Sequence, residues 1–263
     1  MAKKETYLTC PDHNIFEGMT SISSVLYNWE NQTSQRKRTI VRVLFDESKA
    51  RSKARELSYL RKCAERYGFS VELVGAEQID ALTTGNTHGG IIAECAPMEI
   101  PRLSEHDDQI KKDGVYVMLD GVEDPYNFGY SIRSVYASGA DGLILPCRNW
   151  MEVAGIVAKS SAGASERIDM FVADPQEAIA VFREKGYKIV CSGIRNSVSM
   201  YDADMKKPVF LIVGGEKRGI SAAVEASADT VARIEYGREF RGSLSTASAA
   251  TIMTYEIYRQ NRK

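Results

Sequence analysis

Two loops in the second half of the chain carry side chains that could bind a ligand or handle a proton. The first loop follows the apolar run 115–119 and holds Asn127 and, six residues later, Arg133. Asp124 and Pro125 begin a turn, so Asn127 can cap the helix that follows, with Arg133 in reach of its N-terminal end. A capping asparagine and an unrelated surface arginine have the same spacing, and the spacing alone leaves both interpretations open.

The second loop follows the apolar run 209–213 and reads Gly214-Gly215-Glu216, with Gly219 three residues on. Three glycines directly after a buried strand allow a ligand to approach the backbone closely. The loop has neither the Gly-Lys-Ser/Thr ending of a P-loop nor the GxGxxG pattern, which argues against a Rossmann-type nucleotide enzyme. Glu216 at a strand's carboxyl end is better placed to meet a ligand than to act as a structural cap.

A third segment, Ser243-Leu244-Ser245, opens the last helical stretch, which we expect over 243–260. Ser243 is predicted to be its N-cap. The small residues that follow permit close packing against another backbone. An ordinary terminal helix is the alternative, but it does not explain why small polar residues crowd the first turns.

The elements that would position these loops alternate between strand and helix. Near-continuous apolar runs are typical of parallel strands that are covered on both faces. In such sheets, ligands bind outside the carboxyl ends of the strands, which directs attention to the loops after Leu119, Cys191, Val213 and Ile234. The predicted strands are 115–119, 142–145, 168–172, 187–191, 209–213 and 230–234, and the predicted helices are 128–138, 175–185 and 243–260.

The N-terminal part also alternates, with predicted helices at 18–29 and 48–67 and predicted strands at 39–45, 69–74 and 90–95. Gly68 is expected to end the second helix. Residues 96–113 contain Pro97, Pro101 and a dense mixture of charges, which predicts a linker. We therefore expect an N-terminal domain at 1–95 and a C-terminal domain at 114–263.

The net charge of −1 hides a strongly basic stretch in the N-terminal part. Residues 36–66 hold eleven Lys and Arg against four Asp and Glu, a net charge of +7. Phosphate contacts supply most non-specific affinity for nucleic acids, so the stretch is a candidate RNA-binding surface. A solvated helix face would have the same composition. The side chains singled out for RNA binding are Arg36, Lys37, Arg38, Lys53 and Arg55.

Composition argues against several other classes of protein. No apolar run reaches the roughly 18 residues that span a bilayer, and the first residues do not resemble a signal peptide. The five cysteines are scattered without CxxC spacing and there are three histidines, which predicts no metal site. A reduced, cytoplasmic protein is expected.

The three loops together resemble the three motifs of the SpoU (TrmH-type) family of RNA ribose 2′-O-methyltransferases, in the knotted SPOUT superfamily. Asn127 with Arg133 matches the first motif, Gly214 to Gly219 the second, and Ser243-Leu244 the third. The stretch 159–164, Lys-Ser-Ser-Ala-Gly-Ala, matches the segment between the first two motifs. The N-terminal part resembles, less specifically, the family's ribosomal-protein-like α/β domain that grips RNA.

The resemblance implies an α/β fold in which a parallel sheet in the C-terminal domain is tied into a trefoil knot. It implies a homodimer that acts on RNA, with ribosomal RNA favoured over tRNA, and S-adenosylmethionine bound among the knotted loops. The implied cofactor-binding residues are Gly193, Gly214, Gly215, Ile234 and Leu244. The implied catalytic residues are Asn127, Arg133, Glu216, Ser243 and Ser245.

One residue departs from the family pattern. The third motif usually reads Ser-Leu-Asn, whereas this chain has Ser245 in the last place. An asparagine amide both donates and accepts at longer reach than a serine hydroxyl. The sequence therefore favours an active 2′-O-methyltransferase, and the alternative is a knotted protein that binds RNA and cofactor with weak or no turnover.

Overall fold

The computed structural model describes residues 14–35, 37–83, 86–146, 153–215 and 219–262, which form two compact units. The first unit takes in the chain up to Glu99 and a later segment that ends at Arg167. The second unit starts at Ile100 and contains the rest of the chain. No helix in the described ranges is long and apolar enough to cross a membrane.

The second unit is built on a sheet that has seven strands among the described residues, in the order β7-β6-β5-β10-β8-β11-β9. Every neighbouring pair is parallel. The strands are β5 (Val115–Asp120), β6 (Gly142–Leu145), β7 (Asp169–Val172), β8 (Lys188–Ser192), β9 (Val198–Ser199), β10 (Val209–Gly214) and β11 (Thr230–Arg233). The predicted parallel α/β sheet is therefore confirmed.

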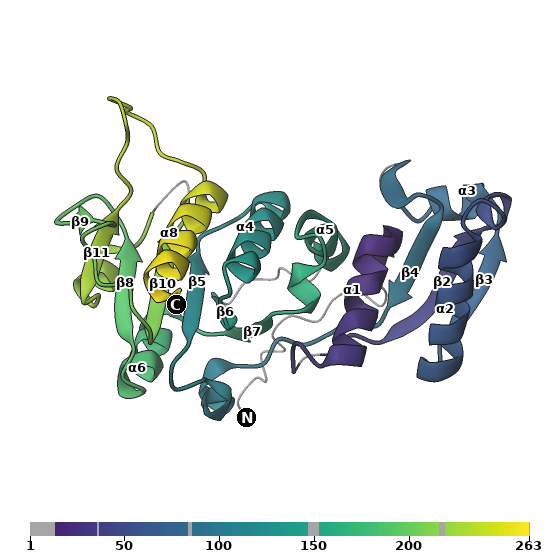
Figure 1. Cartoon of the computed structure of the whole chain (residues 1–263), viewed down its shortest axis with the longest axis horizontal. Helices are drawn as coiled ribbons and strands as arrows, with labels where there is room; N and C mark the ends of the chain where they lie inside the picture. Colours follow the sequence, from purple (N-terminus) through teal and green to yellow (C-terminus); the bar gives the residue numbers. More distant parts are fainter. Residues whose placement is uncertain (1–13, 36, 84–85, 147–152, 216–218, 263) are drawn as a thin grey trace, which may run out of the picture. The chain divides into compact units, whose positions relative to one another are not determined.

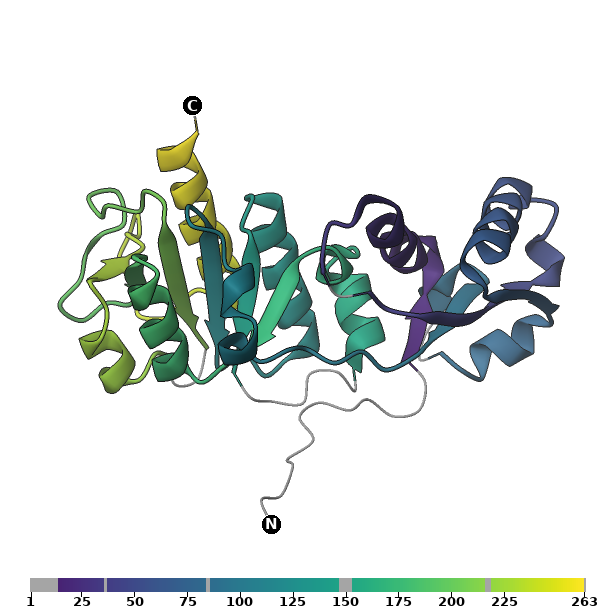
Figure 2. The same ribbon diagram turned by 90° about the horizontal axis from the view of Figure 1, so that it is seen from below.

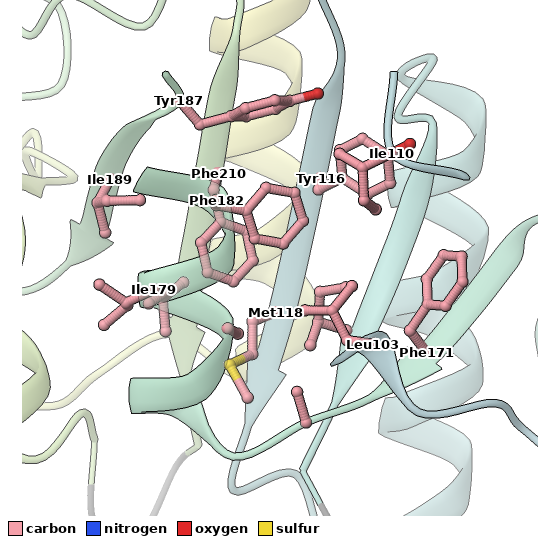
Figure 3. Close-up of a cluster of buried hydrophobic side chains, with 14 of the residues drawn as sticks. Leu103, Ile110, Tyr116, Met118, Phe171, Ile179, Phe182, Tyr187, Ile189 and Phe210 are labelled. Atoms are coloured by element: carbon pink, nitrogen blue, oxygen red, sulfur yellow. The ribbon is translucent and has the colours of Figure 1, made fainter. Parts of the chain in front are cut away.

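Helices cover both faces of this sheet (Figure 1). They are α4 (Pro125–Ala137), α6 (Pro175–Glu184), α7 (Ala222–Ala226) and α8 (Thr246–Asn261). Helices α4 and α8 pack together, and the Thr251 hydroxyl donates a 2.6 Å hydrogen bond to Ser134 Oγ. On the opposite face, Phe182 of α6 stacks on Phe210 of β10 with a centroid distance of 4.2 Å (Figure 3). Because β10 is covered on both faces, its run Val209–Val213 is apolar at every position.

Residues 100–113 of the predicted linker 96–113 pack against the second unit. Two short 3-10 turns, η3 (Leu103–Glu105) and η4 (Asp107–Gln109), lie in this segment. Leu103 and Ile110 are buried in the aromatic core of the second unit (Figure 3), and Val172 donates its backbone N–H to Pro101. The prolines and charges exclude regular structure, but two apolar side chains suffice to hold the segment against the sheet.

The first unit has four described strands in the order β1-β4-β2-β3. They are β1 (Asn14–Glu17), β2 (Ile40–Asp46), β3 (Ser70–Val74) and β4 (Ile91–Cys95), and β2–β3 is the parallel pair. The helices are α1 (Gly18–Asn31), α2 (Ala54–Tyr67) and α3 (Ala76–Asp80), with 3-10 turns η1 (Glu47–Lys49) and η2 (Asn86–His88). Gly68 ends α2 at a φ of 80°, as predicted.

A segment from between β6 and β7 completes the first unit (Figure 2). It contains α5 (Ala154–Ser160) and the turn η6 (Ala164–Glu166), which pack against β1 and α1. The contact is close, because a Cβ atom on Gly155 would lie 1.9 Å from the carbonyl oxygen of Ile15. The first unit is therefore made of two separate stretches of the chain, whereas the sequence prediction had one domain follow the other. The predicted boundaries at 95 and 114 remain predictions.

Candidate functional site

The loops after β5 and β10 touch each other at the carboxyl edge of the second unit's sheet. The two strands pair in parallel register up to Asp120 opposite Gly214. A Cβ atom on the next residue, Gly215, would lie 2.2 Å from the carbonyl oxygen of Gly121. Glycine at 215 is therefore required for this approach, which brings the first two sequence motifs into contact.

The start of α8 meets the same place. Thr246, which is buried, donates its hydroxyl to the carbonyl oxygen of Gly214 at 3.1 Å. Helix α8 also packs along α4, the helix that carries Asn127 and Arg133. All three predicted motifs thus converge on one end of the sheet.

A cavity of about 620 Å³ opens at this edge of the sheet. Its walls come from the loops after β8, β10 and β11 and from the first turn of α8. The predicted residues on its walls are Gly193, Gly214, Gly215, Ile234, Ser243 and Leu244. Its volume is that of a typical small-molecule site.

The candidate residues of the first motif lie on α4 and are absent from the described cavity walls. Asn127 is not the N-cap of this helix, because Asp124 accepts the Asn127 backbone N–H at 2.7 Å. Arg133 is exposed, and its guanidinium forms no ion pair with any residue that the structure describes. Glu216 lies outside the described residues.

Ser245, rather than the predicted Ser243, is the N-cap of α8. Ser245 has extended backbone angles and its hydroxyl accepts the Ser248 backbone N–H at 3.2 Å. Ser243 lies two residues earlier in the exposed loop that rises between β11 and α8 in Figure 1. The chain turns into the helix only at Thr246, where the buried hydrogen bond to Gly214 fixes the backbone.

Further cavity residues were not predicted from the sequence. Arg195 lies two residues after Gly193, in the loop after Cys191. The sequence indicated this loop as a ligand-binding loop, but nothing in the sequence distinguished Arg195 within it. Tyr236 and Phe240 form an edge-to-face pair in the β11–α8 loop. Glu225 comes from α7, which is too short to show a helical period. Gly219, one of the three glycines predicted to let a ligand approach, also lies on the wall. The cavity residues without a sequence prediction are Ser192, Ile194, Arg195, Ile220, Ala222, Glu225, Ala232, Arg233, Tyr236, Phe240, Arg241, Gly242, Thr246 and Ala249.

Two groups beside the cavity have structural roles. The Arg233 guanidinium donates to the Ser197 carbonyl at 2.6 Å and binds Glu235 at 3.1 Å, which anchors the β9 edge. Burial raises the pKa of the Cys191 thiol to about 12, so this side chain stays a neutral core group and is no nucleophile.

The predicted RNA-binding side chains are divided by the structure. Arg38 is 2 % exposed and its guanidinium binds Glu166 at 2.9 Å, so its assignment to RNA binding is wrong. A side chain enclosed in this way cannot reach a phosphate at the surface. Lys37 and Arg55 are exposed, Lys53 donates to the Gly89 carbonyl at 2.7 Å, and Arg36 lies outside the described residues.

Two family models match the chain. The model of the SpoU rRNA Methylase family matches residues 114–255. The model described as RNA 2′-O ribose methyltransferase substrate binding matches residues 18–101.

Curated relatives agree with these matches. A putative TrmH family tRNA/rRNA methyltransferase of Staphylococcus saprophyticus is 32 % identical over 78 % of this chain and 83 % of its own. The 23S rRNA (guanosine-2′-O-)-methyltransferase RlmB of Shewanella oneidensis is 30 % identical over 78 % of this chain and 85 % of its own.

Solved structures share the fold. The AdoMet-bound rRNA methyltransferase from Sinorhizobium meliloti superposes with a TM-score of 0.78 over 96 % of this chain and 89 % of its own, at 23 % identity. The SpoU methyltransferase AviRb from Streptomyces viridochromogenes has a TM-score of 0.75 over 95 % and 90 %, also at 23 % identity.

Proposed function

Because the chain belongs to the SpoU rRNA methylase family, we propose that it methylates the 2′-hydroxyl of one ribose in ribosomal RNA. It is an S-adenosylmethionine-dependent RNA methyltransferase. The choice of ribosomal RNA is supported by the Shewanella relative, which is named for 23S rRNA, and by the substrate-binding model over residues 18–101. The observation that carries the proposal is the cavity walled by the second and third motifs, with the loop after β5 in contact with Gly215 beside it.

The cavity suits the cofactor. Glycine backbone at 193, 214 and 215 leaves room against its walls, and Ile234 and Leu244 offer apolar surface. A Cβ atom at Gly214 would lie 2.6 Å from the backbone of Gly219, so any other residue would displace this wall. We assign cofactor binding to these five residues. When bound, S-adenosylmethionine supplies a methyl group that its sulfonium activates for transfer.

Arg133 is assigned to the RNA. An arginine is almost never deprotonated, so it is a poor base but a good bidentate ligand for phosphate. We propose that Arg133 holds the phosphate beside the target ribose and thereby orients the 2′-hydroxyl, whose oxygen gains the methyl group while its proton passes to solvent water. Its exposure, and the absence of an ion pair with any described residue, support this role. Their positions in the motifs assign three further residues to the same site, namely Asn127, Glu216 and Ser243. Ser245 is assigned to the site because it caps α8, whose first turn borders the cavity.

We extend the proposal to a trefoil knot and a homodimer. The knot is supported by the Thr246–Gly214 hydrogen bond, which seats the start of α8 among the β8, β10 and β11 loops. The dimer is supported by exposed aromatic side chains one turn apart on two packed helices, Tyr126 and Tyr130 on α4, and Tyr255 and Tyr258 on α8. A second copy of the chain would bury these rings.

The test is transfer of tritiated methyl groups to RNA from a strain that lacks the gene. The wild type should label ribosomal RNA, and the label should remain in alkali-resistant dinucleotides, as 2′-O-methylation requires. Arg133→Ala should lower the rate about a hundredfold or more by loss of positioning. Arg133→Lys should recover only part of the lost rate, because lysine keeps the positive charge but lacks the planar guanidinium that binds a phosphate through two hydrogen bonds.

Cofactor affinity is the control for these variants. Calorimetry with S-adenosylhomocysteine should give the same dissociation constant for wild type and Arg133→Ala. Label in a base rather than a ribose, or full activity of Arg133→Ala, would contradict the proposal.

A further inference from the structure

Four basic side chains lie along α2 of the first unit and the turn that precedes it. Arg51, Arg55, Lys62 and Arg66 are spaced by 4, 7 and 4 residues. Arg51 lies in the turn closed by the hydrogen bond from Lys53 N–H to the Lys49 carbonyl, and the helix begins at Ala54 after the non-helical Lys53. At about 100° per residue, the three side chains within α2 fall within an arc of about 40°. We call these four residues the cationic stripe.

The opposite side of α2 is the buried one. Leu57, Leu60 and Cys63 are buried, and the helix packs against β3 (Figure 1). The four residues of the cationic stripe are all exposed. The stripe therefore faces away from the core of its unit, and its charges have no part in folding this helix onto the sheet.

The structure separates the stripe from the other cations of the basic stretch. Arg38 binds Glu166, Arg42 binds Glu72 and Glu94, and Lys49 binds Asp46. None of the four stripe residues has an acidic partner in the ranges that the structure describes, although Arg66 also lies over the Tyr67 ring. Some cations of the stretch are thus engaged in internal ion pairs, whereas those of the stripe, like Lys37 and Arg61, are exposed without an acidic partner among the described residues.

The dimensions of the stripe fit a polyanion. Within α2, eleven residues of helix separate Arg55 from Arg66, a length of about 16 Å, and Arg51 precedes the helix. A single phosphate or carboxylate would engage one or two of these side chains, whereas a nucleic-acid strand offers a phosphate at every nucleotide. Straight spacing and flexible side chains suit contacts to the backbone, which position an RNA without reading its bases.

We propose that the cationic stripe is the surface on which the phosphate backbone of the substrate RNA lies. This rests on the proposed function, which makes RNA the partner. The stripe replaces Arg38 as the anchor of the RNA and adds Arg51, Lys62 and Arg66 to the earlier prediction. It contributes affinity and register, and leaves the choice of nucleotide to the site in the second unit.

The experiment changes all four residues to glutamine in the full chain and measures RNA affinity against salt concentration. Each lost phosphate contact should lower the slope of log K against log salt by about 0.7 to 0.9, so a fall of about 3 is expected. Affinity at low salt should fall by about a hundredfold or more, equally for different RNA sequences. The thermal unfolding midpoint should stay unchanged, since the side chains are exposed.

Two further variants make the result specific. A control variant removes the same charge from the second unit by combining Lys112→Gln, Arg183→Gln, Lys206→Gln and Arg262→Gln. It should leave the slope of log K against log salt nearly unchanged. Arg51→Lys, Arg55→Lys and Arg66→Lys together keep the charge of the stripe and should bind nearly as the wild type does.

An unchanged slope for the glutamine variant in an enzyme that methylates RNA would overturn the stripe while leaving the proposed function intact. If RNA binding depends on salt and requires the stripe, but the protein transfers no methyl group to RNA, the stripe is supported and the proposed function is overturned. Loss of binding to vesicles of anionic lipid, with RNA affinity retained, would assign the stripe to a membrane and also overturn the inference.

Discussion

The hydroxyl of Thr246 donates a hydrogen bond to the carbonyl oxygen of Gly214, 32 positions earlier in the chain. Gly214 ends the central strand β10, and Thr246 begins α8. Both residues border the cavity. One buried side chain therefore ties the start of the last helix to the strand end whose loop meets that of β5.

Thr246→Val should loosen this connection. Valine has nearly the shape of threonine but leaves the Gly214 carbonyl without that donor, which should lower the free energy of unfolding by about 1–3 kcal/mol. Affinity for S-adenosylhomocysteine should fall as well, because the cavity wall shifts. Denaturant unfolding and calorimetry measure the two effects. Thr246→Ser keeps the hydroxyl and should behave nearly as the wild type; equal losses in both variants would show that the methyl group matters instead.

Gly214→Val should abolish cofactor binding. Its Cβ would lie 2.6 Å from Gly219 C and 2.8 Å from Ile220 N, and backbone at that distance must move. Calorimetry with S-adenosylhomocysteine should detect no binding. Gly237→Ala is the matched control, since a Cβ at Gly237 meets nothing within 4 Å. Wild-type affinity in Gly214→Val would exclude this wall from the cofactor site.

Ser245→Ala should act through helix capping. The lost Ser245 cap should lower stability by about 1 kcal/mol, and methyl transfer should fall by about tenfold as the start of α8 frays. Ser245→Asn should retain both, because asparagine is an equally good N-cap. Thermal unfolding and the tritium assay test this together. A silent wild type beside an active Ser245→Asn would mean that this serine, where the family usually has asparagine, prevents turnover.

Arg38→Met should destabilise the first unit strongly. Glu166 is 5 % exposed and would keep a buried charge without its guanidinium partner, at a cost of about 3–5 kcal/mol. Adding Glu166→Gln should restore much of the loss, since the remaining group is neutral. Unfolding by urea measures both variants. If the double variant were no more stable than Arg38→Met, the packing of Arg38 over the Phe16 ring would be the larger effect.

Glu256 should make stability depend on acid pH. Hydrogen bonds from Arg259, at 2.8 and 2.7 Å, and from Gln260 hold the pKa of this carboxyl below its usual value. A lowered folded-state pKa contributes stability that is present above the unfolded pKa, about 4.3, and is lost as the pH falls through the folded value. Glu256→Gln should therefore be less stable than the wild type at pH 7, by about 1–2 kcal/mol. The gap should close as the pH falls below 4.3. Glu184→Gln is the exposed control, and a gap independent of pH would exclude the carboxylate charge as its cause.

Much of the fold was predictable because its longer elements bury continuous or periodic apolar residues. The strands around Val117 and Leu211 and the helix begun at Pro175 were predicted within about one residue. The helix ended by Gly68 was predicted to start at 48 but begins at Ala54. The short elements β1, α3, α5 and α7 were missed, because four to seven residues do not establish a period. Their positions come from contacts with distant parts of the chain, as Gly155 against Ile15 illustrates.

The parts of the cavity wall that consist of glycine backbone could be predicted from the sequence, whereas most of the side chains on the wall could not. Glycines after a buried strand indicated Gly214 and Gly215 as ligand-binding residues, and the family resemblance added Gly193; all three lie on the cavity wall. The N-cap of α8 was predicted at Ser243 instead of Ser245, because both have the right residue type and the start of the helix is set by contacts such as the Thr246–Gly214 hydrogen bond. Arg38 could not be told from its basic neighbours, since its partner Glu166 lies 128 positions away.

The return of α5 and η6 to the first unit limits how the molecule can be taken apart. The chain builds most of its first unit, then β5, α4 and β6 of the second, and then goes back to supply a helix against β1. The first unit is thus discontinuous in the sequence. A graft of residues 1–95 onto another enzyme would leave the face of β1 that receives α5 uncovered, and deletion of the same residues would strip α5 of its support. Exchange of substrate recognition between relatives requires two segments to be moved together, which restricts recombination as a route to new RNA targets.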